Sequence, residues 1–71
     1  MQVRDPKEVG AILRELRLKK GKTQAEVADD LGISLSTYGA YETGARKPKV
    51  NGMIAIAKYY KRRIEAIFFA A

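Results

Sequence analysis

Apolar positions recur at the spacing of a helix along most of the chain, and turn-forming residues separate one recurrence from the next. The first stripe follows the spacing i, i+3, i+4, i+7 and consists of Val9, Ile12, Leu13 and Leu16. Asp5 and Pro6 stand before this stripe as a capping carboxylate and a first-turn proline, and Gly21 follows it as a stop. The pattern therefore predicts a helix over residues 6–20.

A second, shorter helix is predicted over residues 24–31. Thr23 is placed to cap it, and Glu26, three positions on, is placed to bond back to the cap residue in a capping box. Gly32 is able to adopt the left-handed conformation that ends a helix. The buried side of this helix is expected to carry Val27, Ala28 and Leu31.

A third helix is predicted over residues 35–43, because Ser34 offers a cap and Gly44 a stop. Its buried side is expected to carry Tyr38 and Tyr41. Only the turn Gly-Ile-Ser separates it from the preceding helix, so the two helices must cross steeply. The third helix then protrudes from the surface, which is the layout of a helix-turn-helix whose second helix enters the major groove of DNA.

The remaining apolar positions predict two more helices, over residues 50–60 and 63–69. In the fourth we expect the inward residues to be Val50, Met53, Ile54, Ala57 and Tyr60, and the only candidate cap is Asn51. The fifth either follows a tight turn or continues the fourth. We find no strand pattern, so the predicted fold is all-α: a compact bundle of five short helices in one domain, residues 1–71.

Charge and composition narrow the possible functions. The 71 residues carry 14 Lys and Arg against 8 Asp and Glu, a net charge of +6 that favours a polyanionic partner, most commonly nucleic acid. Without Cys or His the chain has no disulfide, no usual zinc site and no usual nucleophile–base pair, so we expect no metal, no cofactor and no enzyme activity. No apolar run approaches the roughly 18 residues of a membrane span, and residues Met1 to Asp5 lack the apolar core of a secretory signal. These features predict a cytoplasmic protein with no membrane partner.

A series of short motifs at fixed spacing extends from about Val9 to Phe68. They are Ile-Leu-Arg-Glu-Leu-Arg from position 12, Thr23-Gln24, Val27-Ala28, Leu31-Gly32-Ile33-Ser34, Tyr41-Glu42-Thr43-Gly44, Arg46-Lys47-Pro48 and Ile56-Ala57-Lys58. With these motifs the chain resembles the phage-repressor class of helix-turn-helix domains, the Cro and cI type also called the xenobiotic-response-element family. The resemblance implies a lambda-repressor-like DNA-binding domain of five helices that acts as a transcriptional regulator and is usually dimeric on DNA.

The resemblance also implies roles for particular residues. Arg17 and Glu42 would form a partly buried ion pair that orients the third helix. The residues expected to contact DNA phosphates are Gln24, Arg46, Lys47 and Lys49, with Thr23 and Ser34 as caps whose phosphate contacts are secondary. The residues expected to contact bases are Leu35, Ser36, Thr37, Gly39 and Ala40.

The base-contacting set departs from the family pattern, because it lacks the amide and guanidinium groups that bond two acceptors on a base edge. Leu35 and Ala40 can instead contact thymine methyl groups, and Gly39 allows a close backbone approach. Alternatively this face contributes little, and specificity comes from Ser36, the loop after the helix, DNA shape or a partner.

The apolar C-terminal segment predicts an interface, because Phe69 has no obvious place in the core. We expect Phe68 and Phe69 to join two subunits of a homodimer, which would set the two recognition helices one DNA turn, roughly 34 Å, apart. The alternatives are a frayed end or a cut in a longer chain.

Taken together, the sequence predicts a sequence-specific regulator of transcription that binds double-stranded DNA, a repressor of phage or mobile-element type in a bacterium. The alternative is a protein-interaction module, such as an antitoxin or co-regulator, that keeps the fold but has weak base contacts. A third interpretation is attachment to a membrane surface through the cluster Lys61-Arg62-Arg63 and the aromatic tail, but the apolar residues of that tail are already needed for the core.

Overall fold

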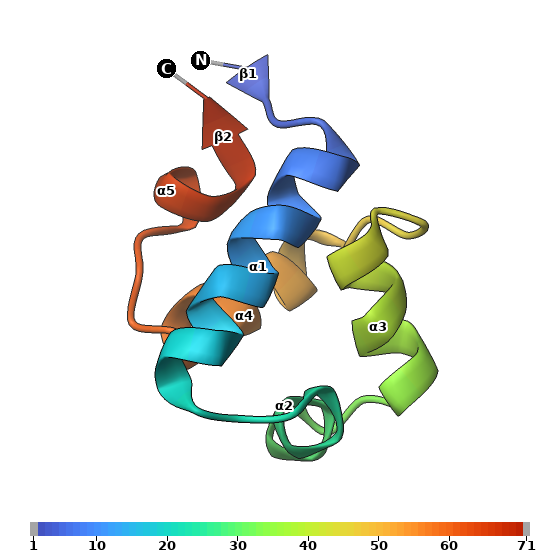
Figure 1. Ribbon diagram of the computed structural model, residues 1–71. Coiled ribbons are helices and arrows are strands. Elements are labelled where there is room, and N and C mark those ends of the chain that lie inside the picture. The colour runs from blue at the N-terminus through green and yellow to red at the C-terminus, as the bar shows by residue number, and fades with distance from the viewer. Residues whose placement is uncertain (1, 71) are drawn as a thin grey trace.

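Within residues 2–70, five helices pack around a small apolar core. Two short strands lie beside one another near the chain ends (Figure 1). The computed structural model describes residues 2–70. In chain order the elements are β1 (Gln2–Val3), α1 (Pro6–Lys20), α2 (Gln24–Leu31), α3 (Leu35–Thr43), α4 (Val50–Tyr59), α5 (Ile64–Phe68) and β2 (Phe69–Ala70). The first three helices have the bounds that their start and stop signals predict, and the prediction of five short helices is confirmed.

Local capping explains where the first three helices begin and end. Thr23 and Glu26 form the capping box of α2, with N···O distances of 2.9 Å and 3.1 Å, and Ser34 caps α3 by accepting from the backbone N–H of Thr37 at 3.1 Å. The glycines that end these helices all have left-handed backbone angles: Gly21, Gly32 and Gly44 at φ 73°, 70° and 82°. These bonds satisfy backbone groups that a helix end otherwise leaves unpaired.

The inward face of α4 differs from the predicted one. Val50 and Ile54 are 64% and 42% exposed, whereas Ile56 is 2% exposed and part of the core. Positions 53 to 57 are all apolar, so periodicity does not select between two overlapping stripes; packing selects the one that contains Met53, Ile56, Ala57 and Tyr60. Asn51 is not the cap either, because Lys49 occupies that position without a side-chain bond.

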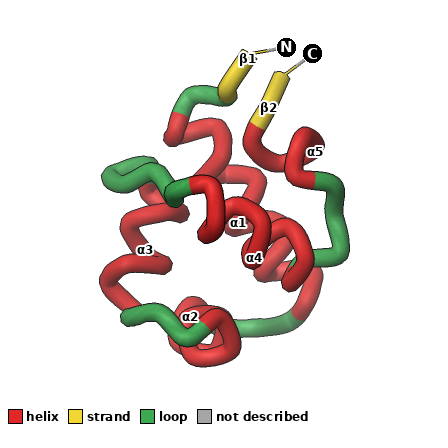
Figure 2. Tube along the Cα trace, turned by 180° about the vertical axis from the view of Figure 1, so that it is seen from behind, coloured by secondary structure: helices red, strands yellow, loops and turns green. Residues whose placement is uncertain are grey.

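The sequence does not predict the two strands, and the prediction of a purely helical fold is therefore wrong at the chain ends. β1 and β2 pair antiparallel, with Gln2 opposite Ala70 and Val3 opposite Phe69, so α5 ends at Phe68 and not at residue 69 (Figure 2). A two-residue strand is too short to show alternation, and this pairing depends on the two chain ends meeting. The fifth helix is separate from α4, because the backbone turns at Lys61 with φ 55°.

Helices α1 and α3 touch through their backbones at Gly10. A Cβ atom built on this residue would overlap the carbonyl oxygen of Glu42 and would lie 2.9 Å from the carbonyl oxygen of Tyr41. Only glycine permits this approach, which sets the position of α3 against α1.

Candidate nucleic-acid interface

The beginning of α3 is the exposed part of the helix pair. Leu35 is 52% exposed and Ser36 is also exposed, whereas Tyr38, one turn further on, is fully buried. Ile33, in the turn after α2, packs against the core and keeps the two helices together. In Figures 1 and 2, α3 forms one side of the molecule with α2 beneath it. The first turn of α3 can therefore be approached from solvent.

The hydroxyl groups at the start of α3 form hydrogen bonds with one another. The Ser34 hydroxyl donates to Thr37 Oγ1 at 2.7 Å and lies 3.3 Å from the Ser36 hydroxyl. Thr37 accepts this bond and keeps its own hydroxyl hydrogen for another partner. Gly39 and Ala40, the other predicted base-contacting residues, are half-buried. Leu35 and Ser36 are thus the two most accessible of the five.

A buried ion pair connects α1 to the end of α3, as the resemblance implied. Arg17 Nε donates to Glu42 Oε2 at 2.7 Å and Arg17 Nη2 donates to Oε1 at 3.2 Å, a two-point arrangement. The side chains of Arg17 and Glu42 are 11% and 3% exposed. Arg17 Nη1 also donates to the carbonyl oxygen of Lys22 at 3.0 Å, so the same guanidinium fixes the chain just before α2.

The third partner in this network was not predicted. Gln24 Nε2 donates to Glu42 Oε1 at 2.9 Å, which ties the first residue of α2 to the end of α3. The two residues are 18 positions apart and no local pattern relates them, so sequence reasoning had no signal for this bond. Gln24 keeps its second amide hydrogen and its Oε1 for other partners.

Hydrogen bonds hold Glu42 in its charged form. Burial alone would raise the pKa of Glu42, but the bonds from Arg17 and Gln24, with the nearby Tyr38 hydroxyl, outweigh that effect. The pKa of Glu42 therefore lies below its usual value. The carboxylate stays ionised at neutral pH and keeps both of its donors.

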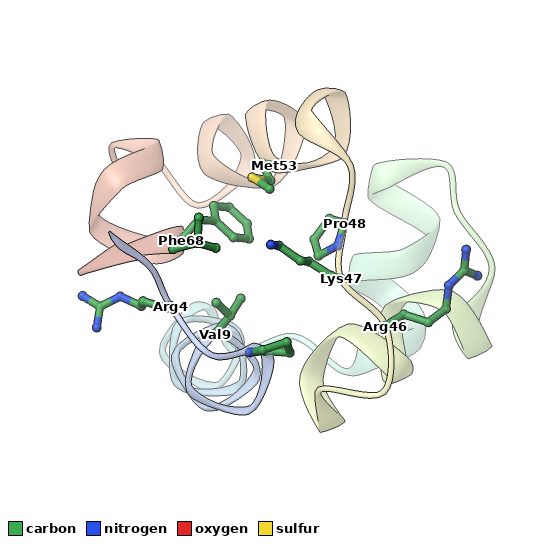
Figure 3. A pocket seen from close by; sticks show the side chains of 9 residues that line it. Arg4, Val9, Arg46, Lys47, Pro48, Met53 and Phe68 are labelled. Atoms are coloured by element: carbon green, nitrogen blue, oxygen red, sulfur yellow. The ribbon is translucent and has the colours of Figure 1, made fainter. Parts of the chain in front are cut away.

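The loop between α3 and α4 carries the cations Arg46, Lys47 and Lys49, all exposed. The N–H of Arg46 donates to the carbonyl oxygen of Ala40 at 3.2 Å, which holds the loop against α3. Figure 3 shows the Arg46 side chain extending away from a small apolar pocket, whereas the Lys47 side chain runs across it towards Phe68. Arg46 is already directed outward, and Lys47 must turn to meet a ligand.

The two C-terminal phenylalanines occupy different environments. Phe68 is 2% exposed and belongs to the core, so its side chain offers almost no surface to a partner. Phe69 is half-buried in β2, opposite Val3, which is 48% exposed. Among the residues 2–70 that the structure describes, Phe69 and Val3 are thus the large apolar side chains that offer surface at this end of the molecule, and Phe68 is buried.

Within residues 2–70 there is no group of His, Cys, Asp or Glu side chains arranged to hold a metal ion. In the same part of the chain, no helix is both long and apolar enough to cross a membrane.

Two steeply crossed helices, the second exposed at its start and flanked by a cationic loop, define a helix-turn-helix domain. A family model described as helix-turn-helix matches residues 13–67. The chain belongs to this helix-turn-helix family, in its phage-repressor or xenobiotic-response-element branch.

Curated relatives come from bacteria and an archaeon. The cryptic phage CTXphi transcriptional repressor RstR of Vibrio cholerae is 40% identical over 48 residues, 68% of this chain and 43% of RstR. The regulator AnsR of Bacillus subtilis is 42% identical over 48 residues, 68% of this chain and 41% of AnsR. An uncharacterized helix-turn-helix regulator of Archaeoglobus fulgidus is 36% identical over 56 residues, 79% of this chain and 80% of that protein. The chain thus spans less than half the length of RstR and AnsR.

Solved structures share the fold at lower identity. The DNA-binding domain of BldD from S. venezulae superposes with a TM-score of 0.78 at 24% identity, over 90% of this chain and 96% of that one. The clp gene regulator ClgR of C. glutamicum superposes with a TM-score of 0.79 at 20% identity, over 90% and 83% of the two chains. These likenesses support the five-helix architecture.

Proposed function

We propose that this domain binds double-stranded DNA sequence-specifically, with α3 in the major groove, and regulates transcription as a repressor of phage or mobile-element type. The observation that carries the proposal is the fixed, exposed start of α3. The Arg17–Glu42–Gln24 network and the backbone contact at Gly10 hold that helix in place, and the loop cations lie beside it. Membership of the helix-turn-helix family and the similarity to RstR, a phage repressor, support the same function.

Phosphate contacts would position the domain on the duplex. Gln24 stands at the first turn of α2, where backbone N–H groups also favour an anion, and its free amide hydrogen would donate to a phosphate oxygen. Arg46 is directed outward for a second contact, and Lys47 and Lys49 would add charge from the same loop. Thr23 and Ser34, both engaged as caps, would contribute at most secondary contacts.

Base contacts would come from the first turn of α3. Leu35 would meet a thymine methyl group, and Ser36 would donate to or accept from a base edge. Thr37, Gly39 and Ala40 would follow along the groove, with Thr37 also able to reach the DNA backbone. This set is small, so we expect moderate base selectivity with a contribution from DNA shape.

We further propose that the protein acts in the cytoplasm, without a cofactor and without catalysis, and that it binds DNA as a homodimer. Phe69, with Val3 opposite it, would supply the apolar part of the subunit interface. Two-fold symmetry would then require a palindromic operator with half-sites one helical turn apart.

A protein-interaction module is the second candidate, and Leu35 is the observation that favours it. A leucine that is 52% exposed at the start of α3 would suit a protein groove as well as a thymine methyl group. The loop cations favour DNA over this alternative.

The decisive experiment selects bound sequences from random duplexes at several salt concentrations. We expect a short consensus and a linear fall of log affinity with log salt. Arg46→Gln should weaken binding to all sequences and reduce the salt slope by about 1, whereas Leu35→Ala should relax preference at one base pair and leave the slope unchanged. Arg63→Gln, which removes an exposed cation before α5, is the matched control for Arg46→Gln.

Two results would contradict the proposal. If no duplex binds even in dilute buffer, the domain does not bind DNA. If duplexes bind without sequence preference, and a protein partner competes through Leu35, the interaction module is the better description.

A further inference from the structure

A second cationic surface lies on the side of the molecule away from α3. A hollow of about 210 Å³ opens between the end of α1, the end of α4 and the loop that leads to α5. We call it the α1–α4 groove; its lining residues are Leu16, Lys19, Lys20, Tyr59, Tyr60, Lys61 and Arg62. Figures 1 and 2, which view the molecule from opposite directions, both place the loop before α5 across the molecule from α3.

Two tyrosines give this groove fixed walls. Tyr60 is 6% exposed, and its hydroxyl bonds to the buried hydroxyl of Tyr38 at 2.6 Å. The ring of Tyr59 packs edge-to-face on Tyr60, with centroids 5.0 Å apart, and its hydroxyl donates to Asp30 Oδ2 at 2.6 Å. Because hydrogen bonds as well as packing hold both rings in place, the fold fixes the shape of the hollow.

The groove carries four positive charges that are poorly compensated. Its lining includes no acidic residue, and Asp30, the carboxylate that accepts the hydrogen bond from Tyr59, also pairs with Lys22 Nζ at 3.2 Å. Lys20 Nζ lies 4.9 Å above the ring of Tyr59. Among the residues that the structure describes, Lys19, Lys61 and Arg62 form no ion pair.

One of these cations is held at a conformational cost. The three preceding helices end at a glycine with positive φ, but α4 ends before Lys61 at φ 55°. The N–H groups of Lys61 and Arg62 bond back to the carbonyl oxygens of Lys58 and Ala57 at 3.1 Å and 3.0 Å, the helix end at which glycine is the usual residue. Lysine is less favourable there than glycine, so the fold carries backbone strain at a position that lines the groove.

We propose that the α1–α4 groove binds a small, multiply charged phosphate anion. The hollow is smaller than the roughly 300–1,000 Å³ of pockets for drug-sized ligands, and its lining is strongly cationic, so a compact polyanion fits it best. Phosphate oxygens accept charge-assisted hydrogen bonds from ammonium and guanidinium groups, and Lys and Arg are the usual partners of phosphate. The site is separate from the surface proposed for DNA.

The test uses pyrophosphate as the probe, at constant ionic strength, followed by calorimetry and by backbone amide NMR. We expect one saturable site, with the largest shifts at residues 19–20 and 60–62. Lys61→Gly should weaken pyrophosphate binding about three- to tenfold, because it removes one charged donor. The same variant should raise the melting temperature, because it relieves the left-handed lysine.

Lys58→Gln is the matched control, because it removes one exposed cation from α4 without touching the groove. It should leave pyrophosphate affinity nearly unchanged. Three outcomes would overturn the proposal: binding that does not saturate, equal weakening by the two variants, or shifts confined to the starts of α2 and α3. The last outcome would mean that the probe binds only at the DNA surface, so this test is distinct from the test of DNA binding.

Discussion

At the scale of single residues, Glu42 is the group on which the position of α3 depends most. Its carboxylate is buried and receives donors from Arg17 on α1 and Gln24 on α2. The net contribution of such a pair is often small, yet removing one partner leaves the other charge buried and uncompensated. We therefore expect a substitution of Glu42 to lower both the stability of the fold and the affinity for DNA.

Glu42→Gln should lower the free energy of unfolding by about 3 kcal/mol, because it leaves the Arg17 guanidinium without its anion. Urea denaturation monitored by circular dichroism measures the change. Glu15→Gln, at an exposed position on α1, makes the same charge change and should have little effect. Coincident unfolding curves for the parent and Glu42→Gln would contradict a structural role for the pair.

The same variant should also alter the dependence of stability on pH. Since the pKa of Glu42 is lower in the folded chain than the usual value of a glutamate in an unfolded chain, its contribution to stability is fully present above that usual value. That contribution is lost as the pH falls through the folded pKa. Glu42→Gln should therefore lose less stability than the parent between neutral pH and acid.

Two glycines at helix positions should respond oppositely to alanine. Gly10→Ala should lower stability by about 1–3 kcal/mol or more, because its Cβ would overlap the backbone of Glu42. Gly39→Ala should be neutral or stabilising by up to about 1 kcal/mol, since its Cβ would meet only Gln24 Oε1 at 3.6 Å. Thermal unfolding of both variants tests this, and a stable Gly10→Ala protein would refute the close helix contact.

At the scale of elements, the sequence predicts best where signals are local. The bounds of α1, α2 and α3 follow from a cap residue at one end and a glycine at the other. The prediction of the inward face of α4 is wrong because the apolar residues of this helix are consecutive, so the sequence does not indicate which of them are buried. The sequence does not predict the β1–β2 pair either, because the two strands meet only in the folded chain.

In the candidate site, too, some contacts can be predicted from the sequence and others only from the structure. The Arg17–Glu42 pair came from the family resemblance, while the bond from Gln24 to Glu42 required the structure, because it depends on how α2 and α3 cross. The direction of Lys47, over the apolar pocket, is likewise a result of packing and not of any motif.

The start of α4 offers a test that separates stability from binding. Lys49 is its N-cap and makes no side-chain bond to the helix, so Lys49→Ser should raise the free energy of unfolding by about 1 kcal/mol. The same change should weaken duplex binding through the lost charge. Lys47→Ser removes an equal charge at a position that caps nothing, so it should weaken binding without the gain in stability. A rise in duplex affinity for Lys49→Ser would exclude Lys49 from the phosphate contacts.

At the scale of the whole molecule, the proposed dimer depends on the surface around β1 and β2. Val3→Glu should shift sedimentation equilibrium towards the monomer, because it places a charge beside Phe69 in the proposed interface. Gln2→Glu adds the same charge on the neighbouring residue of β1 and is the control. Unchanged association of Val3→Glu would place the dimer contact elsewhere.

The contact of α1 and α3 through Gly10 has a mechanical consequence. With no side-chain layer between the two backbones at that point, there is nothing to slide or repack, and interiors packed in this way resist small deformations. Apart from side-chain turns such as that of Lys47, adaptation during complex formation is then left to the nucleic acid. Operators whose central steps bend or twist readily should be favoured over stiffer ones, even at base pairs that no side chain touches.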